Sequence, residues 1–439
     1  MNRRQVLTGA AGIAAAGQNV PGANDKVTLG LIGCGGRGRY VANFMSKAPN
    51  VQFAAAADVY LTNAEAARQW AGGEAKAYQD FRKLLDRKDI DAVLVATPDH
   101  WHAAAAVLAI QAGKHVYVEK PLAHNVREGR AIVDAAARSR QIVQAGTQHR
   151  SAPHFKEVAE ILRSGELGSV HYVRVWNFVN ISPNGIGKEP DAEPPSDLDW
   201  DMYCGPAPLA PYNRKRHLAS YRYFTDYSGG YITDYGTHRF DTVHQIMGVT
   251  APRTVVAAGG RFVLRDAGDV PDLLQVTYEY PGFLMSYEAC NFNAHGAGGR
   301  TPGMKYYNAR GSEDRPNGEA YYGTNGALFT DRIGYEIYPD LKPGSSSEPR
   351  CERRWKNAAD ATGVHAVAFI EAIRGQKPCP APVEVGHQAT NVAHLGNIAL
   401  KTGRKLQWDS AKEMFVNDPD ANKLLARQPR AKWNLIGSG

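Results

Sequence analysis

The stretch Val27-Thr28-Leu29-Gly30-Leu31-Ile32-Gly33-Cys34-Gly35-Gly36-Arg37-Gly38 decides the fold of this chain. Residues 27–32 are mostly apolar and predict a buried strand, and the spacing G-x-G-x-x-G follows directly. Glycines allow a tight turn and a close backbone approach, and a helix that begins at this turn directs its N-terminus at a phosphate. The context predicts a dinucleotide-binding turn, whose ligand contacts we assign to Gly33, Gly35, Gly36, Arg37 and Gly38.

Around this turn, short apolar runs alternate with helical patterns over residues 27–148. That alternation is typical of a parallel sheet covered by helices on both faces, as in a Rossmann domain. The predicted strands are 27–32, 51–57, 92–96, 115–118 and 142–145. The predicted helices are 36–46, 61–71, 101–112 and 126–138.

Beyond Arg150 the pattern changes to sequential strands with few helices, which favours a large, mostly antiparallel sheet. The predicted strands are 170–179, 254–263, 273–280, 283–291, 304–309, 326–330 and 334–338. The predicted helices are 154–164, 229–247, 365–374 and 384–402. We therefore predict an α/β protein with a leader over 1–25, a nucleotide-binding domain over 26–150 and a second α/β domain with an open sheet over 151–439.

Composition and charge exclude several classes of protein. The 439 residues are 43% hydrophobic and 22% charged, which argues against wholesale disorder. The formal net charge is +7, but Lys and Arg are scattered and no basic helix alternates with aromatics, so no nucleic-acid partner is expected. Diffuse positive charge instead favours acidic sugars or a cell-envelope setting. The five cysteines contain no C-x-x-C pair, which excludes a zinc ribbon.

The N-terminus predicts export. Asn2-Arg3-Arg4-Gln5-Val6-Leu7 is a twin-arginine string, followed by a weakly apolar stretch over 8–17. A twin-arginine (Tat) signal would direct the folded protein to the periplasm with its cofactor already bound. The alternative is a cytoplasmic protein with a chance pair of arginines. No other segment is apolar enough to suggest a membrane span.

Two further positions belong to the predicted cofactor site. Asp58 ends the second strand, where a carboxylate bonds both ribose hydroxyls and repels a 2′-phosphate, so NAD is favoured; Arg37 and Arg39 keep NADP as the alternative. Thr97, Pro98 and His102 follow the next long strand, at the sheet edge where ligands bind. His100 and His102 could form half of a metal site. No third ligand stands at a characteristic spacing, so we favour capping and packing roles and expect no metal.

Two short motifs carry the predicted chemistry. Glu119-Lys120-Pro121 follows the 115–118 strand on the same edge, where Lys120 can stabilise charge on a reacting hydroxyl. Asp234 and His238 stand four residues apart, on one face of a helix. The imidazole can accept a hydroxyl proton, while the carboxylate binds substrate or orients the ring.

These motifs, with Gly146–Arg150, together resemble the glucose–fructose oxidoreductase/inositol dehydrogenase/MocA (Gfo/Idh/MocA) family over about residues 27 to 410. Tyr322–Leu328 and His394–Ala399 resemble its exported branch. The resemblance implies hydride exchange at a sugar or polyol carbon, and an open C-terminal sheet that often mediates dimers or tetramers. It implies catalytic roles for Lys120, Asp234 and His238. It also implies cofactor contacts by Glu119 and Gln148, and substrate contacts by His149 and Arg150.

Aromatic residues complete the predicted substrate site. Tyrosines crowd just before and within the catalytic helix, and flat rings suit the apolar faces of sugars; Tyr223 is the one we assign to the substrate. The favoured function is an NAD(P)-dependent sugar, glycoside or polyol oxidoreductase with tightly held cofactor. The alternatives are a redox-neutral glycoside hydrolase acting through a transient keto-sugar, and a cofactor-containing sensor or scaffold.

Overall fold

The computed structural model of the chain describes residues 26–296 and 315–437. The predicted leader over 1–25 and the predicted strand over 304–309 lie outside these ranges. Within them, no helix combines the length and the apolarity needed to cross a membrane.

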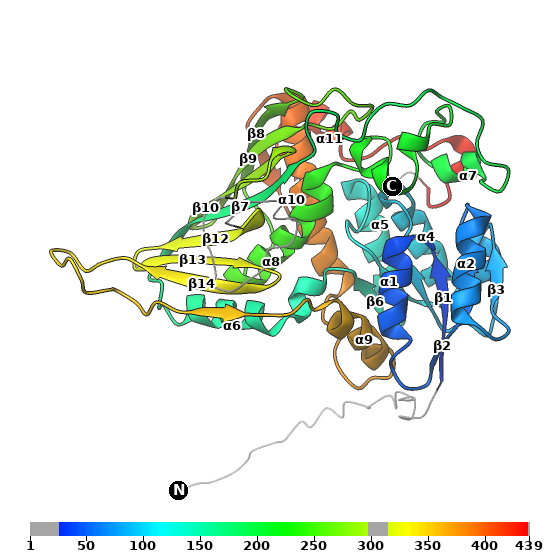
Figure 1. The fold of residues 1–439 in the computed structure, drawn as a ribbon, viewed down its shortest axis with the longest axis horizontal. Coiled ribbons are helices and arrows are strands. Elements are labelled where there is room, and N and C mark those ends of the chain that lie inside the picture. The colour runs from blue at the N-terminus through cyan, green and yellow to red at the C-terminus, as the bar shows by residue number, and fades with distance from the viewer. Residues whose placement is uncertain (1–25, 297–314, 438–439) are drawn as a thin grey trace, which may run out of the picture.

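The N-terminal half is a six-stranded parallel sheet in the order β3-β2-β1-β4-β5-β6, with helices on its faces (Figure 1). The order reverses beside β1, so the carboxyl ends of β1 and β4 border the crevice where such folds bind ligands. The strands are β1 Val27–Ile32, β2 Val51–Ala57, β3 Lys76–Tyr78, β4 Ala92–Val95, β5 His115–Val118 and β6 Val143–Ala145. The helices are α1 Gly36–Met45, α2 Leu61–Ala71, α3 Phe81–Leu85, α4 Asp99–Gln111 and α5 Val126–Ala137.

The second half is built on a large sheet in which β7 pairs with β10 in parallel and the other neighbours are antiparallel. Its strands are β7 Val170–Asn180, β8 Thr254–Gly260, β9 Leu273–Tyr280, β10 Phe283–Cys290, β12 Asn317–Gly323, β13 Gly326–Asp331, β14 Gly334–Pro339, β15 Trp355–Asn357, β16 Leu406–Asp409 and β17 Met414–Phe415, with β11 Phe292–Asn293 beside β7. Its helices are α6 Pro153–Arg163, α7 Trp200–Cys204, α8 Thr237–Met247, α9 Thr362–Ile373, α10 Val383–Thr402 and α11 Pro419–Lys423. The predicted fold class is confirmed.

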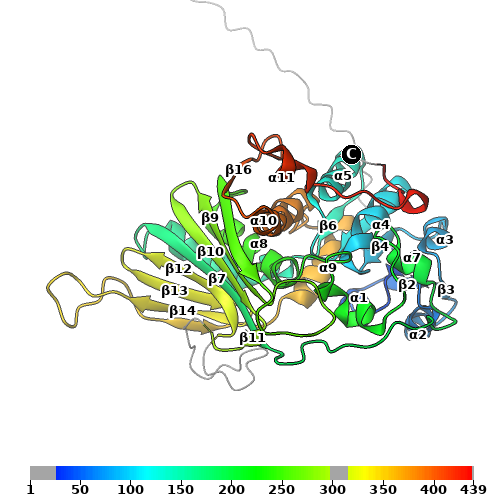
Figure 2. The ribbon, with the colours of Figure 1, turned by 90° about the horizontal axis from the view of Figure 1, so that it is seen from above.

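Helices join the two parts of the chain. The part with the parallel sheet, residues 27–148, is called the first half, and the part with the large sheet is called the second half. In Figure 2, α8 and α10 lie between the large sheet and the parallel sheet, so one face of the large sheet is covered. Late segments also return to the first half: α9 packs on α1, and α10 contacts α5 and β6. Ala366, Phe369 and Ile370 of α9 share a hydrophobic core with Val41 and Met45 of α1. These contacts hold the two parts of the chain together.

The predicted helix over 229–247 differs from the observed backbone. Gly230 has a positive φ of 77°, a π-helical turn spans Ile232–Gly236, and only then does α8 begin at Thr237. A π turn takes up more residues than an α-helical turn, and Asp234 lies within it, whereas His238 lies in the first turn of α8; both side chains line the same cavity. This irregular start sets the position of the predicted catalytic carboxylate.

Candidate active site

The glycine turn is shaped for a ligand. Gly33 has a φ of 87°, and a Cβ on Gly38 would lie 2.2 Å from the carbonyl oxygen of Gly33, so the helix can approach the turn only with glycine there. A Cβ on Gly35 or Gly36 would meet nothing within 4 Å. The first turn of α1 is therefore open to the adjacent cavity, which fits a pyrophosphate held by backbone N–H groups.

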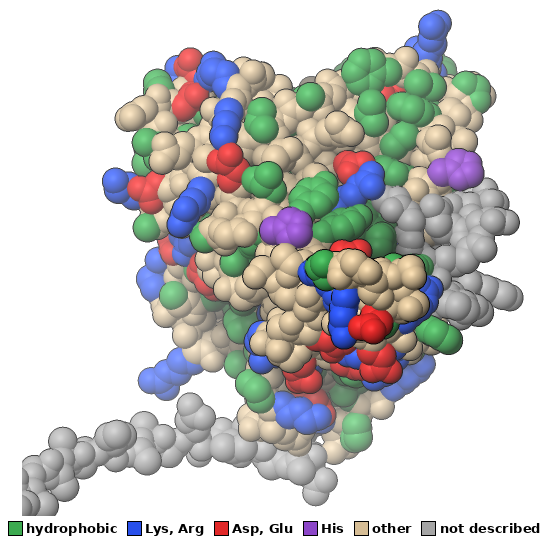
Figure 3. All heavy atoms as spheres, turned by 90° about the vertical axis from the view of Figure 1, so that its left-hand side faces the viewer, with side chains coloured by type: hydrophobic (Ala, Val, Ile, Leu, Met, Phe, Trp, Pro, Cys, Tyr) green, Lys and Arg blue, Asp and Glu red, His purple; other side chains and the backbone are tan. Residues whose placement is uncertain are grey.

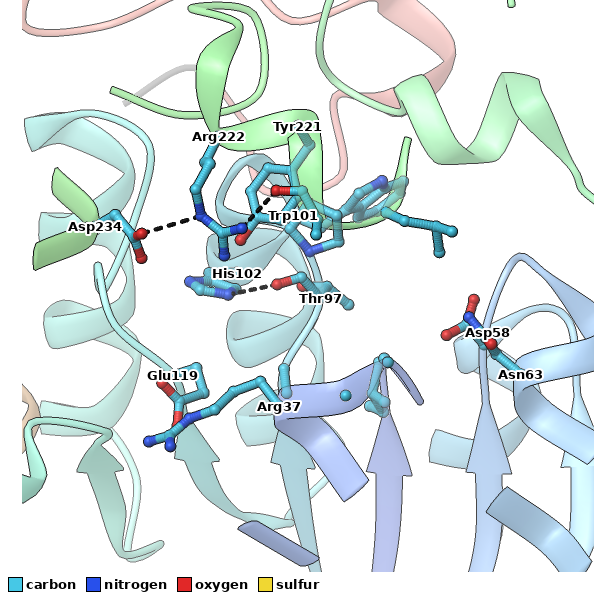
Figure 4. Close-up of a pocket in the computed structure, with 18 of the residues that line it drawn as sticks. Arg37, Asp58, Asn63, Thr97, Trp101, His102, Glu119, Tyr221, Arg222 and Asp234 are labelled. Atoms are coloured by element: carbon cyan, nitrogen blue, oxygen red, sulfur yellow. Dashed lines mark hydrogen bonds and ion pairs between the residues drawn. The ribbon is translucent and has the colours of Figure 1, made fainter. Parts of the chain in front are cut away.

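Asp58 lines the cavity at the end where the sequence predicts the ribose. Its carboxylate accepts hydrogen bonds from the backbone N–H groups of Cys34, at 2.8 Å, and Tyr60, at 2.9 Å. Burial raises the pKa of Asp58 to about 6, against the lowering effect of these hydrogen bonds and of Arg39. Asp58 and Asn63 lie together beside the end of β2, at one end of the cavity (Figure 4). The position fits a ribose diol.

A cavity of about 650 Å³ runs from Asp58 across the glycine turn to α8. Both halves of the chain line it. The first half contributes Gly33, Gly35, Gly36, Arg37, Asp58, Thr97, Pro98, His102, Glu119, Lys120 and Gln148, and the second half contributes Tyr221, Arg222, Tyr223, Tyr231, Asp234, Tyr235, His238 and Arg332.

The two histidines at the start of α4 bind backbone carbonyls. The Nδ1 of His102 lies 2.6 Å from the oxygen of Pro121, and its Nε2 lies 2.9 Å from the oxygen of Thr97 (Figure 4). His100 contacts the carbonyl of Tyr203 at 2.8 Å, and burial lowers its pKa to about 3. These contacts are packing roles, whereas α4 has no side-chain cap, so the predicted capping role is wrong.

Arg37 lies at the catalytic end of the cavity, away from Asp58 (Figure 4). Its Nε donates to Glu119 at 2.7 Å and its Nη2 to Gln148 at 3.3 Å. Arg37 is therefore engaged by the Glu119 carboxylate, and this position does not support a contact between Arg37 and a 2′-phosphate. Its role is to hold Glu119 and Gln148 beside the turn.

Lys120, Asp234 and Arg222 form one charged group across the cavity. The Nζ of Lys120 donates to Asp234 twice, at 2.5 Å to the carboxylate and at 2.9 Å to the backbone carbonyl. The Nε of Arg222 lies 3.0 Å from the other carboxylate oxygen (Figure 4). Burial alone would raise the pKa of Asp234, but Arg222 and Lys120 hold it well below its ordinary value. Asp234 is therefore ionised and shared by two cations.

His238 is adjacent to this group, but its ring contact is with His149, whereas the sequence pattern pairs it with Asp234. Its ring stacks on His149, with centroids 4.8 Å apart and 25° between planes, and His149 in turn stacks on Phe155. Burial, and then His149 and Lys120, lower the pKa of His238 well below 6.5. Asp234 does not offset this lowering of the pKa, because its carboxylate pairs with Lys120 and Arg222. His238 is neutral at pH 7.

The remaining predicted substrate residues separate into two groups. Tyr223 lines the cavity, and its hydroxyl lies 3.2 Å from that of Tyr231. His149 lies behind His238 and does not line the cavity. Arg150 points elsewhere: its Nε donates to the buried carboxylate of Asp241 at 2.7 Å. The structure therefore does not bring Arg150 to the substrate space, since Asp241 binds its guanidinium.

Sequence reasoning missed two arginines of the site, Arg222 and Arg332. Arg222 lies between Tyr221 and Tyr223, within the tyrosine-rich stretch, which is the one signal that points to it. Its segment is fastened to the first half through Asp99, which accepts hydrogen bonds from Tyr221, at 3.0 Å, and Ser228, at 2.5 Å. Arg332 lies in the turn between β13 and β14, and no motif marks it.

Comparisons with known proteins agree with this architecture. Residues 27–147 match the family model described as an oxidoreductase family with an NAD-binding Rossmann fold. Residues 156–280 and 306–435 match that family's C-terminal α/β domain.

Several curated proteins are similar over part of their length. An uncharacterised oxidoreductase of Bacillus subtilis, YrbE, is 26% identical over 58% of this chain and 64% of its own. Inositol 2-dehydrogenase of Salmonella typhimurium is 32% identical over 32% of this chain and 42% of its own. The chain thus spans less than two thirds of the length of these curated relatives.

Solved structures share the fold. The WlbA dehydrogenase of Bordetella pertussis, in complex with NADH and UDP-GlcNAcA, has a TM-score of 0.63 at 16% identity, over 88% of this chain and 99% of its own. Levoglucosan dehydrogenase with NADH and levoglucosan has a TM-score of 0.62 at 18% identity, over 87% and 99%. The two family matches cover most of the chain, and the glycine turn with Asp58 fits the predicted cofactor, NAD. The chain belongs to the Gfo/Idh/MocA oxidoreductase family, and residues 27–147 match the NAD-binding Rossmann fold of that family.

Proposed function

We propose that this protein is an NAD-dependent oxidoreductase that oxidises a hydroxyl-bearing carbon of a sugar, glycoside or polyol. The observation that carries the proposal is the convergence of Lys120, Asp234 and His238 on one cavity with the open first turn of α1. The names of two relatives, inositol 2-dehydrogenase and levoglucosan dehydrogenase, support the substrate class.

Each residue of the site has a separate role in alcohol oxidation. NAD, when bound, supplies the hydride acceptor. Lys120 is held by Asp234 with its ammonium toward the cavity, where it can donate a hydrogen bond to the reacting oxygen and stabilise its developing negative charge. His238 accepts the hydroxyl proton. Its Nδ1 is buried, so Nε2 is the nitrogen left for the substrate.

The stacked histidines keep the proposed base, His238, unprotonated. A general base must be neutral before the reaction, and burial against His149 and Phe155 keeps the imidazole of His238 unprotonated. The aromatic rings of Tyr223, Tyr231 and Tyr235 face the same space and can cover a sugar ring; Tyr231 and Tyr235 stack at 5.4 Å. The site therefore combines a neutral base with an apolar wall.

Three further points belong to the proposal. The twin-arginine string supports export to the periplasm, where a retained cofactor would be recycled by a second sugar. Asp58 at the ribose end supports NAD over NADP. The long open sheet supports a homo-oligomer.

The test begins with the protein as purified. Its absorbance spectrum and the mass of any released nucleotide identify the cofactor, and a panel of sugars, polyols and glycosides is then added. The proposal predicts NADH formation and a keto product with one class of compound. Cleavage of a glycoside without net NADH formation would support the redox-neutral hydrolase instead. Absence of nucleotide binding would contradict both.

A further inference from the structure

Arg222 reaches the catalytic carboxylate from a segment that crosses the cavity, residues 217–223. The side chains of this segment that line the cavity are His217, Leu218, Ala219, Tyr221, Arg222 and Tyr223. The segment begins near Asp58, where the ring of His217 packs against that of Tyr60 with centroids 5.6 Å apart. It ends at the catalytic end, where Arg222 pairs with Asp234 (Figure 4). One short segment thus reaches both ends of the cavity.

Two tyrosines hold the end of this segment in place. The hydroxyl of Tyr221 donates to Asp99 at 3.0 Å, and the hydroxyl of Tyr223 lies 3.2 Å from that of Tyr231. Arg222 lies between these two anchored residues. Its guanidinium group therefore approaches the catalytic carboxylate from a fixed stretch of backbone.

The Asp234 carboxylate has one cation on each oxygen. The Nζ of Lys120 lies 2.5 Å from Oδ1, and the Nε of Arg222 lies 3.0 Å from Oδ2. The terminal torsion of an aspartate side chain is broad and roughly two-fold, so a contact on one oxygen leaves the carboxylate free to turn. Contacts on both oxygens fix its plane. Arg222 therefore determines how Asp234 presents Oδ1 to Lys120.

The position of Asp234 in turn directs the ammonium group of Lys120. An ammonium group has three N–H donors. Among the residues that the structure describes, the Nζ of Lys120 has two acceptors, the carboxylate of Asp234 at 2.5 Å and its backbone carbonyl at 2.9 Å. The third N–H is left for the cavity that Lys120 lines. A turn of the Asp234 carboxylate would redirect this donor away from the reacting oxygen.

This group differs from the ion pairs on the outer surface. On the end of the molecule formed by the large sheet, Lys and Arg side chains lie among Asp and Glu on the exposed surface (Figure 3). Exposed pairs of this kind contribute little. The side chains of Asp234 and Lys120 are only 13% and 15% exposed, and that of Arg222 is 29% exposed. Loss of Arg222 would therefore leave a mostly buried carboxylate with Lys120 as its remaining cationic partner.

We propose that Arg222 is a positioning residue for hydride transfer: it orients the Asp234 carboxylate, which directs the Lys120 ammonium at the reacting hydroxyl. It acts through Lys120 rather than by binding the substrate. This inference rests on the proposed oxidation at the same site. Removal of the guanidinium group should slow the chemical step and leave the affinities for NAD and substrate close to the wild-type values.

The test measures hydride transfer in a single turnover. Protein loaded with NAD is mixed with glucose, galactose, methyl β-glucoside or sorbitol, and the absorbance of NADH is followed. The compound that the wild type oxidises fastest is then used for the variants. Arg222→Gln should slow the transfer about tenfold to a hundredfold, as the misplacement of a reacting group does. Calorimetry should give nearly unchanged dissociation constants for NAD, and for the compound with NADH-loaded protein.

A double-mutant cycle with Lys120 separates positioning from a structural role. In protein that carries Lys120→Ala there is no ammonium group to direct, so Arg222→Gln should cause little further loss of rate. Added guanidinium ion, at concentrations far below those that unfold proteins, should partly restore Arg222→Ala. Sodium chloride at the same ionic strength should not.

A matched control stands next to the segment. The Arg216 side chain is similarly exposed, at 27%, pairs with Asp226 at 3.3 Å and lies over the ring of Phe224, outside the cavity. Arg216→Gln should keep the wild-type rate. The thermal midpoint of each variant shows that it is folded. If Arg222→Gln does not fold, Arg222→Lys gives the same comparison with a smaller expected loss, because an ammonium group can still reach Oδ2.

The outcomes separate this inference from the proposed function. A wild-type rate in Arg222→Gln, or an equal loss with and without Lys120, would overturn the positioning role and leave the proposed oxidoreductase in place. A loss of substrate affinity with an unchanged rate of transfer would also overturn it, because Arg222 would then bind the substrate directly. No NADH formation by the wild type with any sugar, glycoside or polyol would contradict the proposed oxidoreductase, and the positioning role with it.

Discussion

At the catalytic end of the cavity, one ionised carboxylate balances two cations while the neighbouring histidine stays neutral. Asp234 pairs with Lys120 and Arg222, so burial and the stacked ring of His149 lower the pKa of His238 without opposition from Asp234. The roles follow from this division. Lys120 is a fixed cation for a developing oxyanion, and His238 is a base that is unprotonated at neutral pH.

The neutrality of His238 makes a prediction about pH. Because its pKa lies well below 6.5, the rate of oxidation should not fall between pH 8 and 6.5 through protonation of this ring. His238→Asn should keep NAD affinity while slowing oxidation about a hundredfold or more. A matched control is His171→Asn, on an exposed position of β7. Near-normal turnover in His238→Asn would move the base elsewhere.

Asp58 makes a second prediction at the residue scale. Its carboxylate should select NAD, so Asp58→Ala should bring the dissociation constants of NAD and NADP closer together. With a pKa of about 6, the charged form is present above that value and is lost below it, so wild-type NAD affinity should weaken as pH falls through 6. Asp58→Asn should remove that dependence. Tighter binding of NADP than NAD by the wild type would contradict the assignment.

At the scale of elements, regular segments could be predicted and irregular ones could not. Strands β1, β2, β5 and β9 and helix α2 have the predicted bounds, because each is an uninterrupted pattern between turn residues. Strand β12 was missed: Asn317-Gly318 opens it, Gly323 closes it, and its residues are buried on both faces without alternation. The π turn before α8 was missed because hydrophobic periodicity does not register one extra residue.

Some residues of the site could likewise be predicted from the sequence, and others could not. The glycine turn, Asp58 and Lys120 follow ends of parallel strands, so their place at one edge of the sheet could be predicted. The place of His238 beside them was implied by the family resemblance. Arg222 could not be predicted, because it approaches Asp234 from an irregular segment. The His149–His238 stack joins residues far apart in the chain, and only tertiary packing brings them together. Arg150 was wrongly assigned to the substrate, because no sequence pattern indicates that the Asp241 carboxylate binds its guanidinium group.

Helix α1 offers a matched pair of glycine substitutions. A Cβ at position 38 would lie 2.2 Å from a backbone oxygen, whereas a Cβ at position 36 meets nothing within 4 Å. Gly38→Ala should therefore lower the thermal midpoint, because the turn and the helix must separate. Gly36→Ala should keep the midpoint but weaken NAD binding, since its methyl group enters the pyrophosphate space. Unchanged NAD affinity in Gly36→Ala would place the phosphates elsewhere.

At the scale of the whole molecule, the halves are tied together by segments that cross between them. Helix α9 packs on α1, and His365 of α9 bonds the carbonyl of Ala145 at 2.9 Å and the hydroxyl of Ser151 at 2.8 Å. Burial lowers the pKa of His365 to about 4. The join between the halves therefore depends on an uncharged histidine.

This histidine links stability to pH. Its pKa is lower in the folded chain than the unfolded value near 6.5, so below pH 6.5 the unfolded state binds more protons and the free energy of unfolding falls. The contribution is about 1 kcal/mol between pH 7 and 5.5. His365→Asn should be less stable at pH 7 but lose less on acidification, whereas His171→Asn should match the wild type. Urea unfolding at both pH values measures this. A steeper loss in His365→Asn would contradict it.

The most direct test of the account is to follow the transferred hydrogen. Sugars, glycosides and polyols deuterated at every hydroxyl-bearing carbon are incubated with the protein and NAD, and the mass of the nucleotide is measured after one turnover. The account predicts one deuterium in the reduced nucleotide with wild-type protein. Lys120→Ala should bind the nucleotide and slow the transfer about a hundredfold or more. Consumption of substrate with no deuterium in the nucleotide would contradict hydride transfer at this site.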